Sequence, residues 1–120
     1  MGLQKRNQRG AVRVDVLLRV KGELVPPDFP IRIVNLSQTG FAVISEARFR
    51  AGDRLDFRLT GKKGPAVYVT AAAVHTRRLS DSPGLFVTGF SFQPARGSGA
   101  VPHDSIRQLI AAVAPAAFRF

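Results

Sequence analysis

The sequence predicts an all-β domain with one C-terminal helix, built as an antiparallel barrel or sandwich of about six strands. Most of the chain alternates apolar and polar residues, as at Leu55, Phe57 and Leu59, and this period of two gives a strand one buried and one exposed face. Residues that favour turns separate these stretches at short intervals. Only the C-terminal part changes to helical spacing. This combination is typical of a small barrel or sandwich with one added helix.

The first strand is expected over residues 12–21, where aliphatic residues occupy every second position. Gly22 and Pro26-Pro27 predict the turn after it. Further strands are expected at Ile31–Val34, Phe41–Ser45, Arg54–Leu59, Val67–Arg78 and Leu85–Phe92. Turns between the last four are predicted at 51–53, 61–64 and 80–84, where glycine occurs with polar residues or proline.

The C-terminal part predicts one amphipathic helix. Its apolar residues fall at helical spacing: Ile106, Leu109, Ile110 and Val113. Asp104 or Ser105 can cap its N-terminus, and Pro115 is expected to stop it. A glycine-rich link at 95–100 precedes it. We expect the helix to cover an open end of the barrel.

The length of 120 residues predicts a single domain that is large enough to bury a core. Within it we distinguish a basic N-terminal segment (1–13), a β-barrel (14–94), and a link, helix and tail (95–120). Residues 1–13 carry several cations and little apolar surface, so we expect them to be mobile without a partner.

The composition points to an anionic partner. The formal net charge is +10, from 18 Lys and Arg against 8 Asp and Glu, which suits a nucleotide, a nucleic acid or an acidic membrane surface. There is no cysteine, which excludes disulfides and thiolate metal sites. No apolar stretch is long enough for a membrane span, and the N-terminus lacks the apolar core of a secretory signal. We therefore expect a soluble, cytoplasmic protein.

Two short motifs carry the functional prediction: Arg9-Gly-Ala-Val-Arg13 and Asn35-Leu-Ser37-Gln-Thr-Gly40. A guanidinium can pair bidentately with the O6 and N7 acceptors of guanine and can also bind phosphate oxygens. Asn35 offers a donor and an acceptor and Ser37 a hydroxyl, while Gly40 allows a positive φ or a close backbone approach. Taken separately, the arginines would be solvated surface residues and the second motif an ordinary turn.

In this order and spacing the two motifs resemble the PilZ domain family, bacterial receptors for cyclic di-GMP. The stretch Leu85–Phe92 is similar to the family's closing G-x-x-F strand, whereas Gly10 stands where many members have a second basic residue. The resemblance implies a PilZ-like split barrel. It assigns guanine and phosphate contacts to Arg9 and Arg13, and a guanine-holding role to Asn35, Ser37 and Gly40. Possible additional contacts come from Arg6, Gln8 and Gly10.

The expected function is binding of cyclic di-GMP by a protein that is not an enzyme. The eight carboxylates are scattered, and His75 and His103 are too few and too far apart for a metal site. We therefore predict no catalytic residue, no metal and no cofactor beyond the ligand. Ligand binding would order residues 1–13 and change a surface that an effector protein recognises, in a monomer or a ligand-dependent dimer.

Two other functions remain open at this stage. A small basic barrel could bind single-stranded nucleic acid, although few aromatic residues alternate with basic ones on any strand. A PilZ-like scaffold could act through protein contacts without a ligand, although both motifs are intact. Calorimetry with cyclic di-GMP and with an oligonucleotide of equal charge would separate these possibilities.

Overall fold

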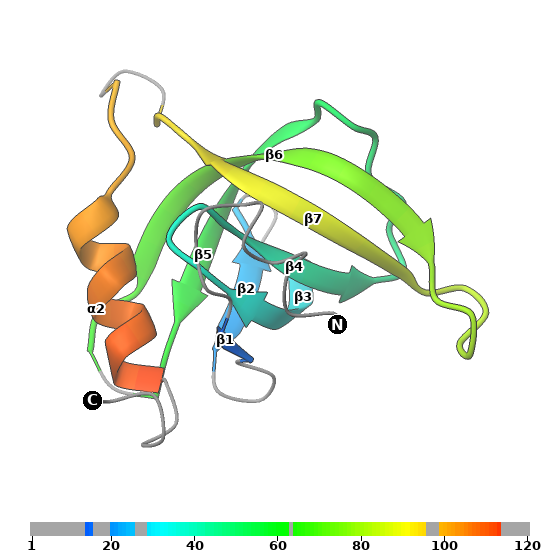
Figure 1. Ribbon diagram of the computed structural model, residues 1–120, viewed down its shortest axis with the longest axis horizontal. Coiled ribbons are helices and arrows are strands. Elements are labelled where there is room, and N and C mark those ends of the chain that lie inside the picture. Colours follow the sequence, from blue (N-terminus) through cyan, green and yellow to red (C-terminus); the bar gives the residue numbers. More distant parts are fainter. Residues whose placement is uncertain (1–13, 16–19, 26–28, 63, 96–98, 114–120) are drawn as a thin grey trace, which may run out of the picture.

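A computed structural model describes residues 14–15, 20–25, 29–62, 64–95 and 99–113. Within these residues the chain forms seven strands and one helix (Figure 1). The strands are β1 (Val14–Asp15), β2 (Lys21–Leu24), β3 (Phe29–Leu36), β4 (Gly40–Ser45), β5 (Arg54–Thr60), β6 (Val67–Arg78) and β7 (Phe86–Gln93), and the helix is α2 (His103–Val113). No helix in these ranges is long and apolar enough to cross a membrane.

Six of the strands form a closed antiparallel barrel, as predicted. The order is β3-β2-β5-β6-β7-β4, and pairing between β3 and β4 closes the ring. The two-residue strand β1 is outside this ring, and among the described residues it pairs with β3 alone. Closure satisfies the backbone hydrogen bonds of all six strands and leaves no free edge between them.

Phenylalanine side chains fill the barrel. Phe41, Phe57 and Phe90 come from three different strands and are at most 2% exposed. Their ring centroids lie 5.0 Å (41–57), 5.4 Å (41–90) and 4.9 Å (57–90) apart. Such ring pairs contribute about 0.5–1.5 kcal/mol each beyond the burial of apolar area. The aromatic residues therefore belong mainly to the core, and the binding surface must be built from other residue types.

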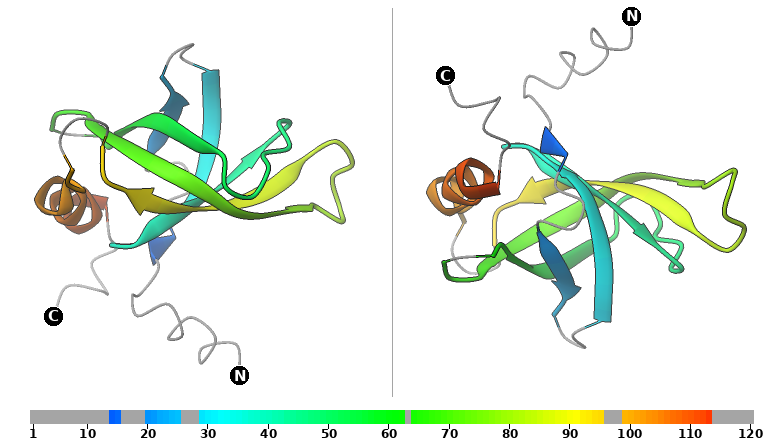
Figure 2. Two further views of the ribbon diagram at one scale, coloured as in Figure 1. Left: turned by 90° about the horizontal axis from the view of Figure 1, so that it is seen from above. Right: turned by 90° about the horizontal axis from the view of Figure 1, so that it is seen from below.

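The predicted C-terminal helix is confirmed, and α2 lies at one end of the barrel (Figure 2). Its buried residues, Ile106, Leu109 and Val113, join the barrel core. The predicted cap is wrong, because the carbonyl of Pro102 accepts the hydrogen bond of the Ile106 amide at 3.1 Å and makes Pro102 the capping position. Asp104 and Ser105 therefore lie in the first turn of α2. The predicted stop at Pro115 lies outside the described residues.

The start of the barrel also differs from the prediction. A single strand over 12–21 was expected, but β2 begins only at Lys21, and Gly22 lies inside this strand instead of forming a turn. A Cβ atom at Gly22 would lie 2.7 Å from the side chain of Ile33 on the neighbouring strand. Gly22 therefore lies in close packing against the Ile33 side chain, which would have to shift to admit a Cβ atom, and it does not form a turn. The strand predicted at Ile31–Val34 is longer than expected and becomes β3.

The turns predicted at 51–53, 61–64 and 80–84 separate the later strands as expected, with Lys63 outside the described residues. Three of their glycines, Gly52, Gly64 and Gly84, have positive φ angles. The ends of the later strands differ from the prediction by only one residue: β5 ends at Thr60, and β7 runs from Phe86 to Gln93.

Candidate ligand-binding site

The second motif forms the turn between β3 and β4, and Ser37 holds it together. The Ser37 amide donates to the carbonyl of Gly40 at 2.9 Å. Its hydroxyl oxygen accepts hydrogen bonds from the amides of Thr39 at 3.2 Å and Gly40 at 3.3 Å. The residue is 1% exposed. A side chain expected to face a guanine therefore points inward in the structure, where it fixes the shape of the turn.

Gly40 is the first residue of β4 and passes very close to β7. A Cβ atom at this position would lie 1.9 Å from the carbonyl oxygen of Phe90. Of the two reasons considered for a glycine here, a positive φ and a close approach, the structure shows the second. The approaching group is the protein's own backbone, so Gly40 is needed to bring the turn against the sheet.

Asn35 faces outward because β3 carries a bulge. Ile33 pairs with Val43 and Asn35 pairs with Ala42, which leaves Val34 as an extra residue between them. An extra residue reverses the inward and outward alternation of a strand. Ile33 and Leu36 both face the core, and Asn35, between Val34 and Leu36, lies half-buried on the outer side.

Strand β1 brings the end of the first motif beside the second. Val14 pairs with Leu36, and Asp15 pairs with Asn35. Val14 directly follows Arg13 in the sequence, and Leu36 directly precedes Ser37. Two segments that are 20 residues apart in the chain are therefore neighbours in the fold. The other candidates of the first motif, and Arg13 itself, lie outside the described residues: Arg6, Arg9, Gly10 and Gln8.

A row of paired residues crosses the outer face of the barrel from Asn35. Asn35 pairs with Ala42, Ala42 with Gly89, and Gly89 with His75. Ala42 and Gly89 alternate along their strands with core residues, so they lie on the side of the sheet away from the core, although both are buried. The next row, Gly40, Ser91 and Ala72, also has only small side chains. We call this surface of Gly40, Ala42, Ala72, Gly89 and Ser91 the small-residue floor.

His75 borders the small-residue floor on the side opposite Asn35. A second bulge makes this possible, because Ala73 pairs with Phe90 and His75 with Gly89, so that Val74 is the extra residue. The imidazole lies against Gly89, where a Cβ atom would be 3.2 Å from its Cε1 atom. From the sequence, this histidine was considered as a metal ligand and rejected, and no part in ligand binding was assigned to it. The one signal available was its alignment with Gly89, which requires the strand register.

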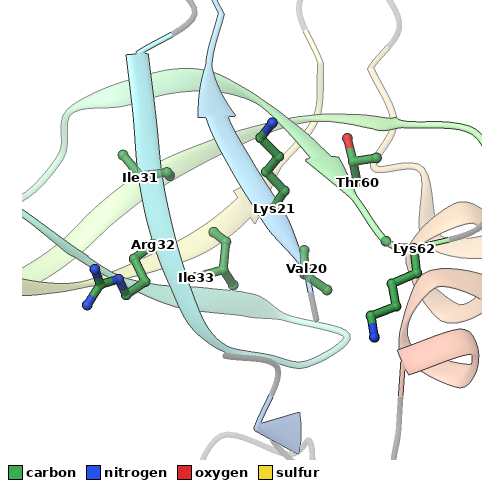
Figure 3. A pocket seen from close by; sticks show the side chains of 8 residues that line it. Val20, Lys21, Ile31, Arg32, Ile33, Thr60 and Lys62 are labelled. Carbon is green, nitrogen blue, oxygen red and sulfur yellow. The ribbon is translucent and has the colours of Figure 1, made fainter. Parts of the chain in front are cut away.

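A pocket of about 330 Å³ opens between β2, β3 and the end of β5 (Figure 3). Val20, Ile31 and Ile33 form its apolar floor, and its cationic residues are Lys21, Arg32 and Lys62. In Figure 3 the three cationic side chains extend in different directions and do not converge on one point. No group of acidic, histidine or cysteine side chains within the described ranges could hold a metal ion.

The sequence model of the PilZ domain family matches residues 4–112. Search of curated protein sequences gave no match.

Three solved structures share the fold. The PilZ domain with c-di-GMP of YcgR from Escherichia coli has a TM-score of 0.59 at 14% identity, covering 86% of this chain and 88% of that one. The Bacillus subtilis inhibitor of motility MotI (DgrA) has a TM-score of 0.64 at 15% identity, covering 86% and 48%. YcgR from E. coli in complex with c-di-GMP has a TM-score of 0.62 at 12% identity, and the match covers 85% of this chain and 44% of that one. The chain thus spans about half the length of the last two.

Proposed function

Because the chain belongs to the PilZ domain family, we propose that it is a receptor for cyclic di-GMP that binds this nucleotide between the first motif and the β3–β4 turn. The observation that carries the proposal is the pairing of β1 with β3. It joins Val14 to Leu36 and Asp15 to Asn35, so that the residues next to both motifs share one short ladder. We infer that the arginine pair, whose second member Arg13 directly precedes Val14 in the sequence, would then lie near this polar turn.

In this proposal the two motifs have different tasks. Arg9 and Arg13 supply the charge, because guanidinium groups can neutralise the phosphates and pair with the O6 and N7 atoms of guanine. Asn35 supplies neutral hydrogen-bonding groups from the outer face. Ser37 acts as a positioning residue through its bonds to the amides of Thr39 and Gly40. Gly40 lets the turn approach the sheet.

The small-residue floor gives a flat nucleotide room to lie against the barrel. Asn35 and His75 border it from opposite sides, three strands apart, which corresponds to roughly 14 Å at the usual spacing of strands. Larger side chains on Ala42 or Gly89 would stand in this space. An imidazole at its border can stack on a base or hydrogen-bond to its edge.

The signal would be transmitted by residues 1–13. Cyclic di-GMP would hold Arg9 and Arg13 against the β3–β4 turn, and the backbone ordering cost of about 1–2 kcal/mol per residue would keep the affinity moderate and binding reversible. The protein would thus change its surface when it binds the messenger, without any chemical reaction, and an effector protein would recognise the changed surface.

Nuclear magnetic resonance of the ¹⁵N-labelled full chain tests this proposal. Titration with cyclic di-GMP should shift the amide signals of Asn35, Gly40, Ala42 and Gly89 more than that of Tyr68, which lies on β6 beyond the floor. Amide exchange should also slow between Lys5 and Arg13. Shifts centred on Tyr68 would contradict the site. Unchanged exchange at 5–13 would contradict the ordering step and leave the site standing.

A further inference from the structure

A second concavity lies where the connection between β4 and β5 runs beside β6. The amide of Gly52 donates to the carbonyl of Ala73 at 2.7 Å, and the amide of Ala73 donates to the carbonyl of Asp53 at 2.8 Å. The Thr76 hydroxyl donates to the carbonyl of Phe49 at 2.8 Å. These bonds hold the connection against β6 and leave a hollow of about 710 Å³. These three hydrogen bonds thus fix the walls of the hollow.

The hollow combines free positive charge with exposed apolar surface. Arg48 and Arg50 line one wall, and Val74 and His75 line the other; we call it the basic pocket. In the part of the chain that the structure describes, neither arginine has an ion pair. The Arg48 guanidinium lies 5.8 Å from the centroid of the Phe86 ring, which leaves its donors available. Val74, the extra residue of the β6 bulge, is 49% exposed.

We propose that the basic pocket binds an acidic segment of a partner protein, with an apolar side chain of that segment packed on Val74. Arginine beside an apolar patch is typical of protein interfaces, where guanidinium groups pair with carboxylates around a small apolar centre. A second copy of this chain would bring its own charge of +10 toward the two arginines, which charge repulsion opposes.

Two other anionic partners fit the pocket less well. Single-stranded nucleic acid stacks its bases on several exposed rings, whereas His75 is the one exposed ring in the pocket lining, because Phe49 is packed edge-on against Phe90 with centroids 5.2 Å apart. A membrane surface is broad, whereas the two arginines and Val74 surround a concavity. A narrow peptide segment can enter such a hollow and reach both walls.

His75 connects the basic pocket with the proposed ligand site. It lines the pocket, and its imidazole lies against Gly89 in the small-residue floor. A nucleotide on that floor would contact a side chain that the partner segment also contacts. This inference deepens the proposed receptor function, since it names the surface and the partner chemistry through which the bound state could be read.

Fluorescence anisotropy with two synthetic peptides tests the inference. The first alternates glutamate with leucine, and the second has serine in place of leucine and carries the same charge. The full chain should bind the leucine peptide about tenfold more tightly, and Val74→Ser should remove most of this preference. The double substitution Arg48→Glu and Arg50→Glu should weaken binding of the leucine peptide by at least about tenfold.

The matched control is Arg32→Glu with Lys62→Glu, which changes the charge equally in the pocket of Figure 3. Equal weakening by both double variants, or equal binding of both peptides, would overturn the inference in favour of diffuse charge. Stronger competition by oligothymidylate or by vesicles containing phosphatidylserine would overturn the choice of partner. Calorimetry with cyclic di-GMP on the same samples separates the two proposals: retained nucleotide binding without peptide binding refutes only the basic pocket.

Discussion

Arg13→Ala is expected to weaken cyclic di-GMP binding by roughly 2–4 kcal/mol, or about 30- to 900-fold, because a charge-assisted and bidentate contact is lost and ligand groups remain unpaired. The residue precedes Val14, whose pairing with Leu36 sets this end of the motif beside the β3–β4 turn. The free energy of unfolding should change little, since charged side chains seldom contribute to an apolar core. Isothermal calorimetry measures the first effect and urea denaturation the second.

The choice of control for Arg13 depends on the structure. Arg58 is a basic residue on a strand away from both motifs, but it donates to the Glu23 carboxylate at 2.5 Å and 2.9 Å, so its removal would leave a half-buried acid without this partner. Arg78 is a better match. It lies three residues beyond His75 on β6, roughly 10 Å along the strand from the border of the small-residue floor. Comparable losses for Arg78→Ala and Arg13→Ala would show diffuse charge instead of a site.

Gly40→Ala is expected to destabilise the barrel by at least about 3 kcal/mol, because a methyl group would meet the carbonyl oxygen of Phe90 and backbone must move to admit it. The added Cβ atom would lie 1.9 Å from that oxygen. The same shift would move the turn that Ser37 holds, so cyclic di-GMP binding should fall as well. Urea denaturation and calorimetry of the same variant report the two effects.

Gly64→Ala separates a steric cost from a conformational one. Gly64 has a φ of +89°, and nothing lies within 4 Å of where its Cβ atom would be. Its substitution should therefore cost only about 1 kcal/mol, from the left-handed backbone, and should not affect ligand binding. If both glycine variants lost the same stability, the close approach of β4 to β7 would not be the reason for Gly40.

The barrel could be predicted from the sequence because most of its strands follow simple alternation. The apolar positions of β5, such as Phe57 and Leu59, both face the core. Alternation fails where a strand carries an extra residue. The bulges at Val34 and Val74 depend on which residues of the neighbouring strand are paired, and a single strand's sequence does not contain this information. Both bulges lie beside the candidate site, where they turn Asn35 and His75 outward.

The position of the turn that belongs to the candidate site could be predicted from the sequence, but the tasks of its residues could not. The spacing of Asn35, Ser37 and Gly40 identified the β3–β4 turn, but all three types could equally face a ligand. Only the hydrogen bonds of the Ser37 hydroxyl to the amides of Thr39 and Gly40 show that it shapes the turn. The close contact between Gly40 and Phe90 joins residues 50 positions apart, and local sequence patterns do not report such contacts.

Calorimetric titration of the full chain with cyclic di-GMP, cyclic di-AMP and an oligonucleotide of equal charge tests receptor function most directly. We predict saturable binding of cyclic di-GMP with a Kd of order micromolar, about −8 kcal/mol. Cyclic di-AMP should bind much more weakly, because adenine presents a donor where guanine presents the O6 acceptor, and an arginine cannot pair with it. Equal affinity for the two cyclic dinucleotides, or tighter binding of the oligonucleotide, would contradict the proposed function.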